Sequence, residues 1–176
     1  MSSIIHKTNN HSHRNTRLPG EHPSGDRGQL IFLVIFLTSW ILDSFVFRFS
    51  LFLGQYIPIY LRLIFAFCLI SLALYFVQNG HRVLSEDAIK NPRVFKDGVF
   101  ARLRHPIYSA ALLFYVFLLI LTCSLIGLGI FVFIFIFYNF IASYEEKILL
   151  EKYGREYQEY MDQVPKWIPR LRPAKF

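Results

Sequence analysis

Long apolar runs alternate with polar segments along the chain, and this pattern predicts membrane-spanning helices. A helix needs about 20 apolar residues to cross a hydrocarbon core of roughly 30 Å. Residues 29–47 and 56–77 reach this length with one charged residue each, Asp43 and Arg62. Residues 106–144 contain no Asp, Glu, Lys, Arg or His, and this length suits two spans joined by a tight turn. The four predicted transmembrane helices, forming two hairpins, are residues 29–47, 56–77, 106–122 and 125–144.

Composition supports an all-α integral membrane protein with one domain, residues 29–176. Hydrophobic residues make up 54% of the 176 positions and charged residues 18%, below the roughly 25% of soluble domains. These values exclude a disordered chain and argue against a soluble globular domain. The two cysteines, Cys68 and Cys123, lie in apolar runs and provide neither a disulfide framework nor a zinc site. We expect no metal, because the histidines near the N-terminus match no ligand spacing.

The first 28 residues are polar and rich in His, Asn, Ser, Gly and Pro, which predicts a disordered tail. The span that follows does not resemble a cleaved signal peptide, because it begins after this tail and lacks a small-residue cleavage site.

The basic residues predict the orientation of the spans. All of the 19 Lys and Arg residues except Arg48 and Arg62 lie in the tail, in residues 78–105 or after Tyr144. The positive-inside rule therefore places both termini and the central loop in the cytoplasm. The host membrane is either a bacterial inner membrane or the endoplasmic reticulum. We expect membrane lipids as neighbours and no nucleic-acid partner.

Asp43 and Arg62 are ionisable residues inside predicted spans, where a charge is costly and often functional. With the first outer turn near Leu51 and Phe52, Asp43 lies about nine residues before the turn and Arg62 about ten after it, so antiparallel packing would bring the two to a similar depth. We expect an interhelical ion pair that locks the hairpin, and the alternative is a role in substrate binding.

Two stretches carry candidate chemistry at the cytoplasmic boundary. The first, residues 97–108, contains Gly98 and Phe100, then two arginines, and ends on His105-Pro106-Ile107-Tyr108. His105 and Tyr108 are three residues apart and share one face of the helix entrance.

The second stretch begins with Glu145-Glu146 at the end of the fourth span. Neighbouring helical positions diverge by about 100°, so one of the two glutamates can face the bundle while the other faces water. We expect Glu146 to be solvated or paired with Lys147 or Lys152. The rest of residues 145–176 is predicted to form an amphipathic cytoplasmic segment, lying on the membrane or folding back over the bundle.

Together these stretches resemble the isoprenylcysteine carboxyl methyltransferase and phospholipid methyltransferase superfamily, whose members are small membrane enzymes that use S-adenosylmethionine. The shared pattern is a Gly-x-aromatic turn, Arg-His-Pro-x-Tyr, a helical hairpin, Glu-Glu and aromatic-Gly-x-x-Tyr-x-x-Tyr. The matching positions are Gly98 and Phe100, Arg104–Tyr108, Glu145–Glu146, Tyr153–Tyr160 and Ile168-Pro169.

The resemblance implies S-adenosylmethionine as cofactor, with a methyl group passing to a lipophilic acceptor. By position, the implied cofactor-binding residues are Val94, Phe95, Phe100, His105, Pro106, Ile107, Tyr108 and Glu145. Aromatic faces and a carboxylate suit a cationic sulfonium. No catalytic residue follows from the resemblance.

One position departs from the superfamily pattern. Ile141 stands where prenylcysteine methyltransferases commonly carry a substrate-holding Arg, four residues before the paired glutamates. A prenylcysteine carboxylate would lose that counter-charge. A phospholipid amine, a thiol or an isoprenoid acid is therefore at least as good an acceptor, with Ile141 and Asn139 as candidate substrate contacts.

Two other functions stay open at the level of sequence. Sterol-type membrane reductases share an Arg-His-Pro-x-Tyr hairpin and use NADPH, but they usually have more spans. The third possibility is a non-catalytic four-helix membrane protein.

Overall fold

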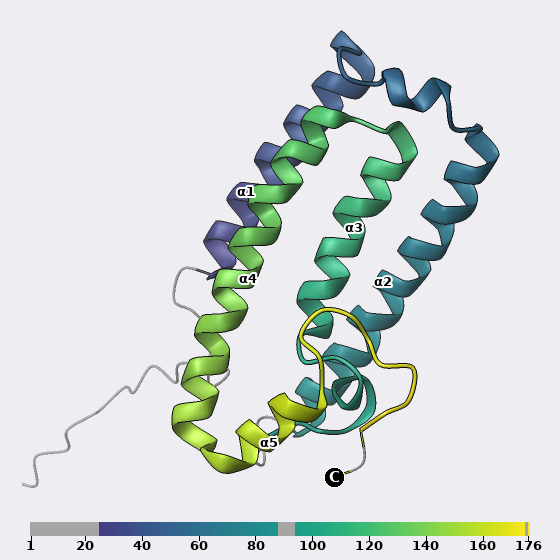
Figure 1. The fold of residues 1–176 in the computed structure, drawn as a ribbon. Helices are drawn as coiled ribbons and strands as arrows, with labels where there is room; N and C mark the ends of the chain where they lie inside the picture. Colours follow the sequence, from purple (N-terminus) through teal and green to yellow (C-terminus); the bar gives the residue numbers. More distant parts are fainter. Residues whose placement is uncertain (1–24, 88–93, 175) are drawn as a thin grey trace, which may run out of the picture.

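The computed structural model describes residues 25–87, 94–174 and 176, and within these ranges the chain is helical and contains no strand (Figure 1). The predicted disordered tail falls mainly on residues outside this description, but residues 25–28 already form the first turn of a helix. The elements are α1 (Gly25–Ile41), the π-helix η1 (Leu42–Phe47), the 3-10 helix η2 (Phe52–Gln55), α2 (Ile59–Asp87), the 3-10 helix η3 (Gly98–Ala101), α3 (Pro106–Thr122), α4 (Leu125–Tyr153) and α5 (Arg155–Gln163).

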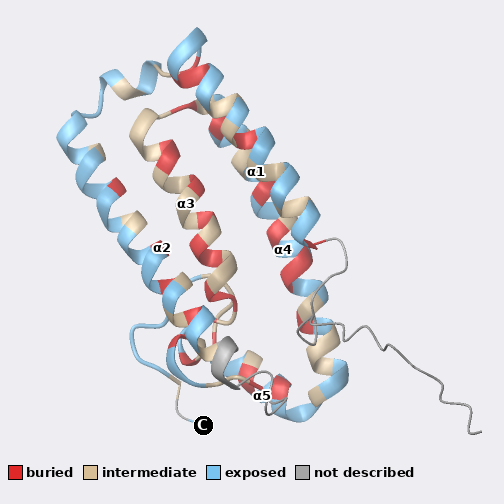
Figure 2. Cartoon of the chain, turned by 180° about the vertical axis from the view of Figure 1, so that it is seen from behind, coloured by how far each residue is buried: buried red, intermediate tan, exposed pale blue. Residues whose placement is uncertain are grey.

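Three helical segments are long and apolar enough to cross a membrane: Gly25–Phe47, Ile59–Val83 and Leu125–Tyr153. The fourth apolar helix, α3, has 17 residues and a length of about 25 Å. Figure 2 shows exposed positions along much of the length of α1, α2 and α4. Large apolar side chains, among them Phe67 and Phe133, are exposed on these helices. Such a surface would be unfavourable in water and suits contact with lipid. The predicted all-α integral membrane fold is confirmed.

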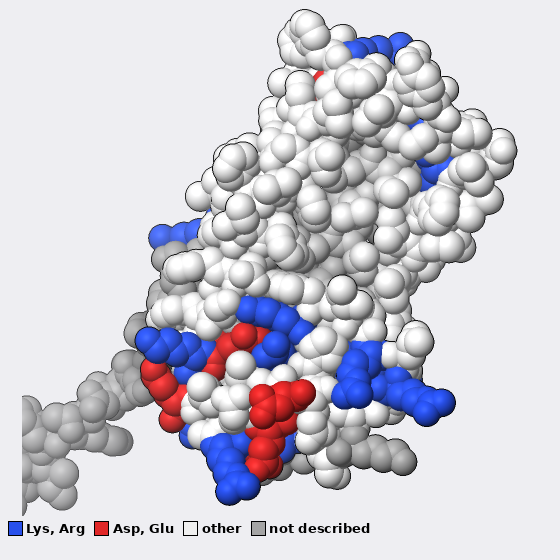
Figure 3. All heavy atoms as spheres, in the orientation of Figure 1, with Lys and Arg blue, Asp and Glu red and all other residues white. Residues whose placement is uncertain are grey.

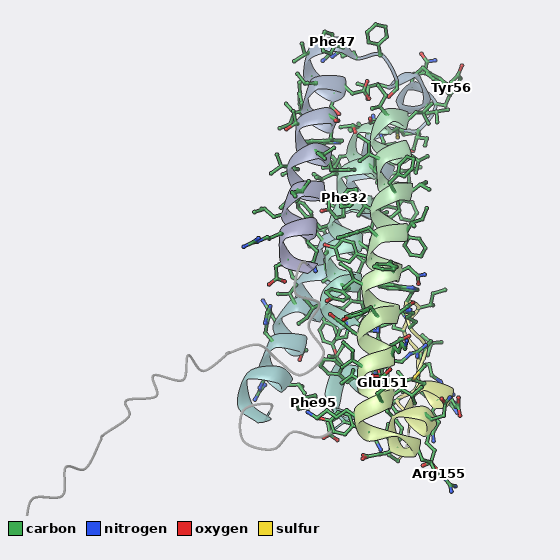
Figure 4. The ribbon with its side chains drawn as sticks, turned by 90° about the vertical axis from the view of Figure 1, so that its left-hand side faces the viewer. Phe32, Phe47, Tyr56, Phe95, Glu151 and Arg155 are labelled. Atoms are coloured by element: carbon green, nitrogen blue, oxygen red, sulfur yellow. The ribbon has the colours of Figure 1, made fainter. Side chains whose placement is uncertain are left out.

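The helices pack in an order that differs from their order along the chain. α2 packs along α3, and α1 packs along α4. Figures 1 and 2 show α3 lying between α2 and the α1–α4 pair. The segment around η2 therefore bridges the bundle at one end, and the chain crosses to a different pair of helices there. We call this the η2 end and the other the α5 end; in Figure 4, Phe47 and Tyr56 mark the first, and Phe95 and Arg155 the second.

Two apolar clusters hold the bundle together. Phe36 of α1 packs edge-on against Tyr115 of α3 in a core with Ile134 and Tyr138 of α4. In the other, Ala73 and Phe76 of α2 meet Val99, Leu103 and Ala110. Gly80 permits this close approach, because a Cβ at this position would lie 3.0 Å from Ile107 Cγ1. The start of α3 is thus fixed against α2.

The charges at the η2 end do not form the expected ion pair. Asp43 accepts hydrogen bonds from the Ser50 and Ser124 hydroxyls and from the Ser50 N–H, at 3.1 Å. Arg62 Nη1 instead donates to the Leu121 carbonyl, 3.0 Å away. The prediction of an Asp43–Arg62 pair is wrong, since it assumed that α1 and α2 pack together.

Both charged side chains are bonded to groups at helix termini. The Ser50 hydroxyl accepts from the N–H groups of Leu125 and Ile126 at the start of α4, and thereby links them to Asp43. Arg62 binds a carbonyl at the end of α3. A carboxylate near a helix N-terminus and a cation near a C-terminus both complement the helix dipole.

At the α5 end the chain turns back over the bundle. Gly154, between α4 and α5, has φ 55° and ψ −127°, a conformation that side-chain-bearing residues avoid. Tyr157 and Tyr160 of α5 are buried, and the Tyr160 hydroxyl donates to the Phe100 carbonyl. Residues 164–174, which we call the C-terminal strap, then run beside residues 101–104. The two segments are joined by backbone hydrogen bonds from Arg104 to Pro165, Arg170 to Arg102 and Ala174 to Ala101.

Candidate functional site

Most of the charged side chains visible in Figure 3 gather at the α5 end, and a buried cluster lies among them. His105 Nε2 is 2.9 Å from Glu146 Oε1. Arg104 Nη1 lies 3.1 Å from the same oxygen, and Lys166 Nζ of the C-terminal strap lies 3.2 Å from Oε2. The predicted solvated Glu146, paired with Lys147 or Lys152, is therefore wrong: only 7% of this residue is exposed.

Glu145 reaches the same histidine from its other side. The Tyr108 hydroxyl donates a hydrogen bond to Glu145 Oε1, and Glu145 Oε2 lies 3.9 Å from His105 Nδ1. Adjacent glutamates do diverge around a helix, but here the imidazole ring stands between their two carboxylates. The strap covers the side on which Glu146 would otherwise meet water. Both members of the Glu-Glu pair thus belong to one site.

Aromatic rings form the walls around His105. Its ring is nearly parallel to that of Tyr108, with centroids 5.7 Å apart, and Trp167 of the strap lies 5.9 Å away on a tilted plane. Tyr138 of α4 packs edge-on against Tyr108. Two helices and the strap therefore enclose the cluster and keep its local dielectric constant low.

Burial lowers the pKa of His105 below its ordinary value of 6.5, while the hydrogen bond with Glu146 opposes this shift. Arg104 and Lys166 add to the lowering, since both are cations close to the ring. The histidine is accordingly neutral at pH 7. A neutral ring carries one proton, and the hydrogen bond to the Glu146 carboxylate assigns it to Nε2.

Other predicted site residues lie in a second group, beside α5. Val94 is buried against Tyr157, Tyr160 and Val164, and it lines a cleft of about 400 Å³ together with Gly98 and Ala174. The Phe95 and Phe100 rings are in contact, with centroids 6.2 Å apart. The bond from the Tyr160 hydroxyl to the Phe100 carbonyl connects this group to α5.

The remaining predicted residues lie apart from both groups. Pro106 and Ile107 flank Gly80 and so meet α2, not the carboxylates. Ile141 is fully buried one helical turn before Glu145. Asn139 is exposed on α4, where its side-chain oxygen accepts a hydrogen bond from the Trp167 indole. The structure thus brings His105, Tyr108 and Glu145 together and leaves the other candidates around them.

Sequence reasoning missed Arg104, Glu146, Lys166 and Trp167 as members of the site. The sequence left open whether residues 145–176 lie on the membrane or fold back over the bundle, and so it did not assign side chains of the strap to the site. The available signal was Pro165-Lys166-Trp167, a basic and an aromatic residue after a proline, following an amphipathic segment long enough to turn back.

The apolar helical bundle is that of an integral membrane protein. Its enclosed polar cluster lies at one end of the bundle, close to the membrane boundary. The family model for phospholipid methyltransferases matches residues 60–156, which extend from α2 to the start of α5. This match covers more than half of the chain, so the protein belongs to the phospholipid methyltransferase family, and the predicted superfamily membership is confirmed. No curated protein matches the chain in sequence.

Proposed function

We propose that the protein transfers a methyl group from S-adenosylmethionine to a lipophilic acceptor at the α5 end of the bundle. The observation that carries this proposal is the convergence of Glu145, Tyr108 and His105 on one enclosed point, within the part of the chain that matches the methyltransferase family. Both termini and this site would face the cytoplasm, in line with the distribution of basic residues.

The residues at the site fit this cofactor chemically. A sulfonium is cationic, and carboxylates and aromatic faces in a low-dielectric site favour it. The Ser109 hydroxyl, one helical turn beyond His105, is buried without a hydrogen-bond partner among the described residues and offers a further polar contact. When bound, the cofactor supplies an electrophilic methyl group. Glu145 and Tyr108 would hold its polar groups, and the second group around Val94, Phe95 and Phe100 would hold its less polar part.

The acceptor would enter from the lipid side. Ile141 provides no counter-charge for a prenylcysteine carboxylate, and the nearby Arg104 is already in contact with Glu146. These features favour a phospholipid amine or a thiol over a carboxylate such as prenylcysteine or an isoprenoid acid. Alignment and exclusion of water would supply much of the rate acceleration, because methyl transfer is a direct displacement.

Calorimetry on the detergent-solubilised protein tests this proposal. We expect saturable binding of S-adenosylmethionine near one site per chain, no binding of NADPH, and loss of binding in Glu145→Gln. Glu151→Gln is the matched control, because Glu151 is an exposed carboxylate on the same helix (Figure 4). Binding of NADPH alone would indicate a reductase, and binding of neither nucleotide by folded protein would contradict an enzymatic role.

A further inference from the structure

The C-terminal strap carries three basic residues, Lys166, Arg170 and Arg172, and no acidic one. Its Arg170 N–H donates to the carbonyl of a further arginine, Arg102, and Lys166 is bound to Glu146. The side chains of Arg102 and Arg172 are exposed, and neither forms a hydrogen bond or an ion pair with a described residue. This part of the α5 end therefore holds two positive charges that no described group neutralises.

Two large apolar side chains of the strap are exposed next to these arginines. Ile168 is 79% exposed, and Leu171, between Arg170 and Arg172 in sequence, is 95% exposed. The backbone of the strap is fixed by its hydrogen bonds to residues 101–104. Basic residues that alternate with exposed large apolar ones are typical of segments that lie in the membrane interface.

The contacts of Trp167 place the strap at the depth of the membrane. Its indole N–H donates to the Asn139 side-chain oxygen at 3.1 Å, and its ring centroid lies 5.7 Å from that of Phe135. Both partners are exposed residues of α4, inside the uncharged run 106–144. Asn139 comes one and a half helical turns before Glu145, which is about 9 Å along the axis. Trp167 therefore lies deeper in the membrane than the paired glutamates.

After Trp167 the strap returns to the membrane boundary. Arg170 is bonded to the backbone of Arg102, one helical turn before α3 begins at Pro106. Figure 1 shows the strap, in yellow, passing beside the start of α3. Figure 3 has the same orientation, and there a group of basic side chains stands to the right of the α5 end, apart from the acidic ones. The exposed arginines thus lie at the level of lipid headgroups.

We propose that the strap and Arg102 form a binding surface for anionic phospholipid headgroups of the surrounding leaflet. The phosphate oxygens accept hydrogen bonds from the guanidinium groups of Arg102 and Arg172, a pairing that suits the planar donors of arginine. Ile168 and Leu171 contact the acyl chains of the same lipids. A zwitterionic lipid carries its own cation beside the phosphate, so two arginines attract it less strongly than an anionic lipid. This surface does not depend on the proposed methyl transfer.

The first test measures how brominated lipids quench the fluorescence of Trp167. In a Trp40→Phe background Trp167 is the only tryptophan. The protein is reconstituted into phosphatidylcholine that contains brominated phosphatidylglycerol or, at the same mole fraction, brominated phosphatidylcholine. We expect stronger quenching by the anionic lipid, because it accumulates beside the strap.

Two double variants show whether the arginines cause this preference. Arg102→Gln/Arg172→Gln should reduce the relative affinity for the anionic lipid by about fivefold for each arginine. Lys152→Gln/Arg155→Gln removes two exposed charges around the turn between α4 and α5, where Figure 4 shows Arg155 at the tip of the α5 end, and should keep the preference. Equal quenching by both lipids in the Trp40→Phe protein, or a preference that the first variant retains, would overturn the proposal.

Glycerol 3-phosphate in the buffer distinguishes a lipid surface from a site for small anions. It carries the phosphate of the headgroup without acyl chains, so we expect it to leave the quenching by brominated phosphatidylglycerol unchanged. Loss of that quenching would indicate a small-anion site and would contradict a surface for lipids.

The second test concerns the apolar part and leaves the arginines intact. Ile168→Cys and Leu171→Cys are spin-labelled in a Cys68→Ala/Cys123→Ser background and reconstituted with phosphatidylglycerol. We expect oxygen, which concentrates in hydrocarbon, to relax both labels more than a water-soluble nickel complex does. A label at Gln158→Cys, on the exposed face of α5, should show the reverse. Dominant relaxation of the two strap labels by the nickel complex would show that the strap faces water, and would overturn the proposal.

Discussion

The bundle carries a buried carboxylate network at each end, and the two differ in what neutralises the charge. At the η2 end, Asp43 is held by two serine hydroxyls and a backbone N–H, and these serines also satisfy the N–H groups that begin α4. At the α5 end, Glu146 contacts the side chains of Arg104, His105 and Lys166. The first network is tied to the backbone, and the second is made of side chains.

This difference separates a structural carboxylate from a candidate functional one. A carboxylate that completes a helix start cannot change partners without opening the helix. A carboxylate surrounded by titratable and cationic side chains can exchange protons or partners while the backbone stays in place. Burial alone does not distinguish them, because Asp43 and Glu146 are 3% and 7% exposed.

Apart from Glu145→Gln, which is expected to lose cofactor binding altogether, the largest effect on activity is expected from Glu146→Gln. The amide cannot match the charge of Arg104 and Lys166, and it holds the tautomer of His105 less firmly. Methyl transfer should fall by about 100-fold, while circular dichroism and thermal unfolding show a folded protein. Asp43→Asn, assayed per folded molecule, is the control at the other end. Equal losses of activity in the two variants would remove the distinction between the ends.

The largest effect on stability is expected from Asp43→Asn. An amide cannot accept from Ser50 and Ser124 as the carboxylate does, so donors at the start of α4 are left poorly satisfied. The free energy of unfolding should fall by about 2 kcal/mol, measured as a lower midpoint in detergent. Unchanged stability would show that the η2 end is not held by this network.

Removal of the positive charge of Lys166 in the C-terminal strap should have a smaller effect on cofactor binding and on stability. Lys166→Gln removes one cation from Glu146 and weakens the contact with Ser143. We expect faster proteolysis of the C-terminal strap and a reduction of cofactor affinity by about threefold to tenfold. The matched control is Lys152→Gln, because Lys152 is exposed on α4 and contacts Tyr153. Identical proteolysis in the two variants would contradict a specific role for Lys166.

The smallest predicted effect concerns pH. The pKa of His105 is lower in the folded protein than its ordinary 6.5. Below about pH 6.5 the unfolded chain therefore binds more protons, and the free energy of unfolding decreases as the pH falls further. His105→Gln should reduce this slope, relative to the wild-type protein, in denaturation curves recorded between pH 7.5 and 5. A slope that His105→Gln leaves unchanged would mean that folding does not shift the pKa of this ring.

The sequence predicted the helical membrane fold because apolar length is a local property that hydrophobic runs record directly. It also pointed to His105, Tyr108 and Glu145, which the structure brings together, while their part in cofactor binding stays a prediction. It did not predict that α2 packs on α3 and α1 on α4, since helix pairing depends on surfaces far apart in the chain. For that reason Asp43 and Arg62 were assigned to each other, not to helix termini.

Helical geometry alone could not predict that Glu146 belongs to the buried cluster around His105. Its partners come from the segment before α3 and from the strap, and the strap's return depends on the turn at Gly154 and on backbone hydrogen bonds with residues 101–104. A sequence pattern that places one glutamate inward and its neighbour outward holds for an isolated helix. It fails where a later segment covers the outward side.

The most direct test of the account is calorimetric titration of S-adenosylmethionine into Glu145→Gln and Asp43→Asn side by side, with wild type as reference. Both variants replace one buried or partly buried carboxylate by an amide, but at opposite ends of the bundle. We predict that Glu145→Gln loses binding and that Asp43→Asn, titrated below its unfolding temperature, keeps wild-type affinity. Retained binding in Glu145→Gln, or loss of binding in folded Asp43→Asn alone, would contradict a cofactor site at the α5 end.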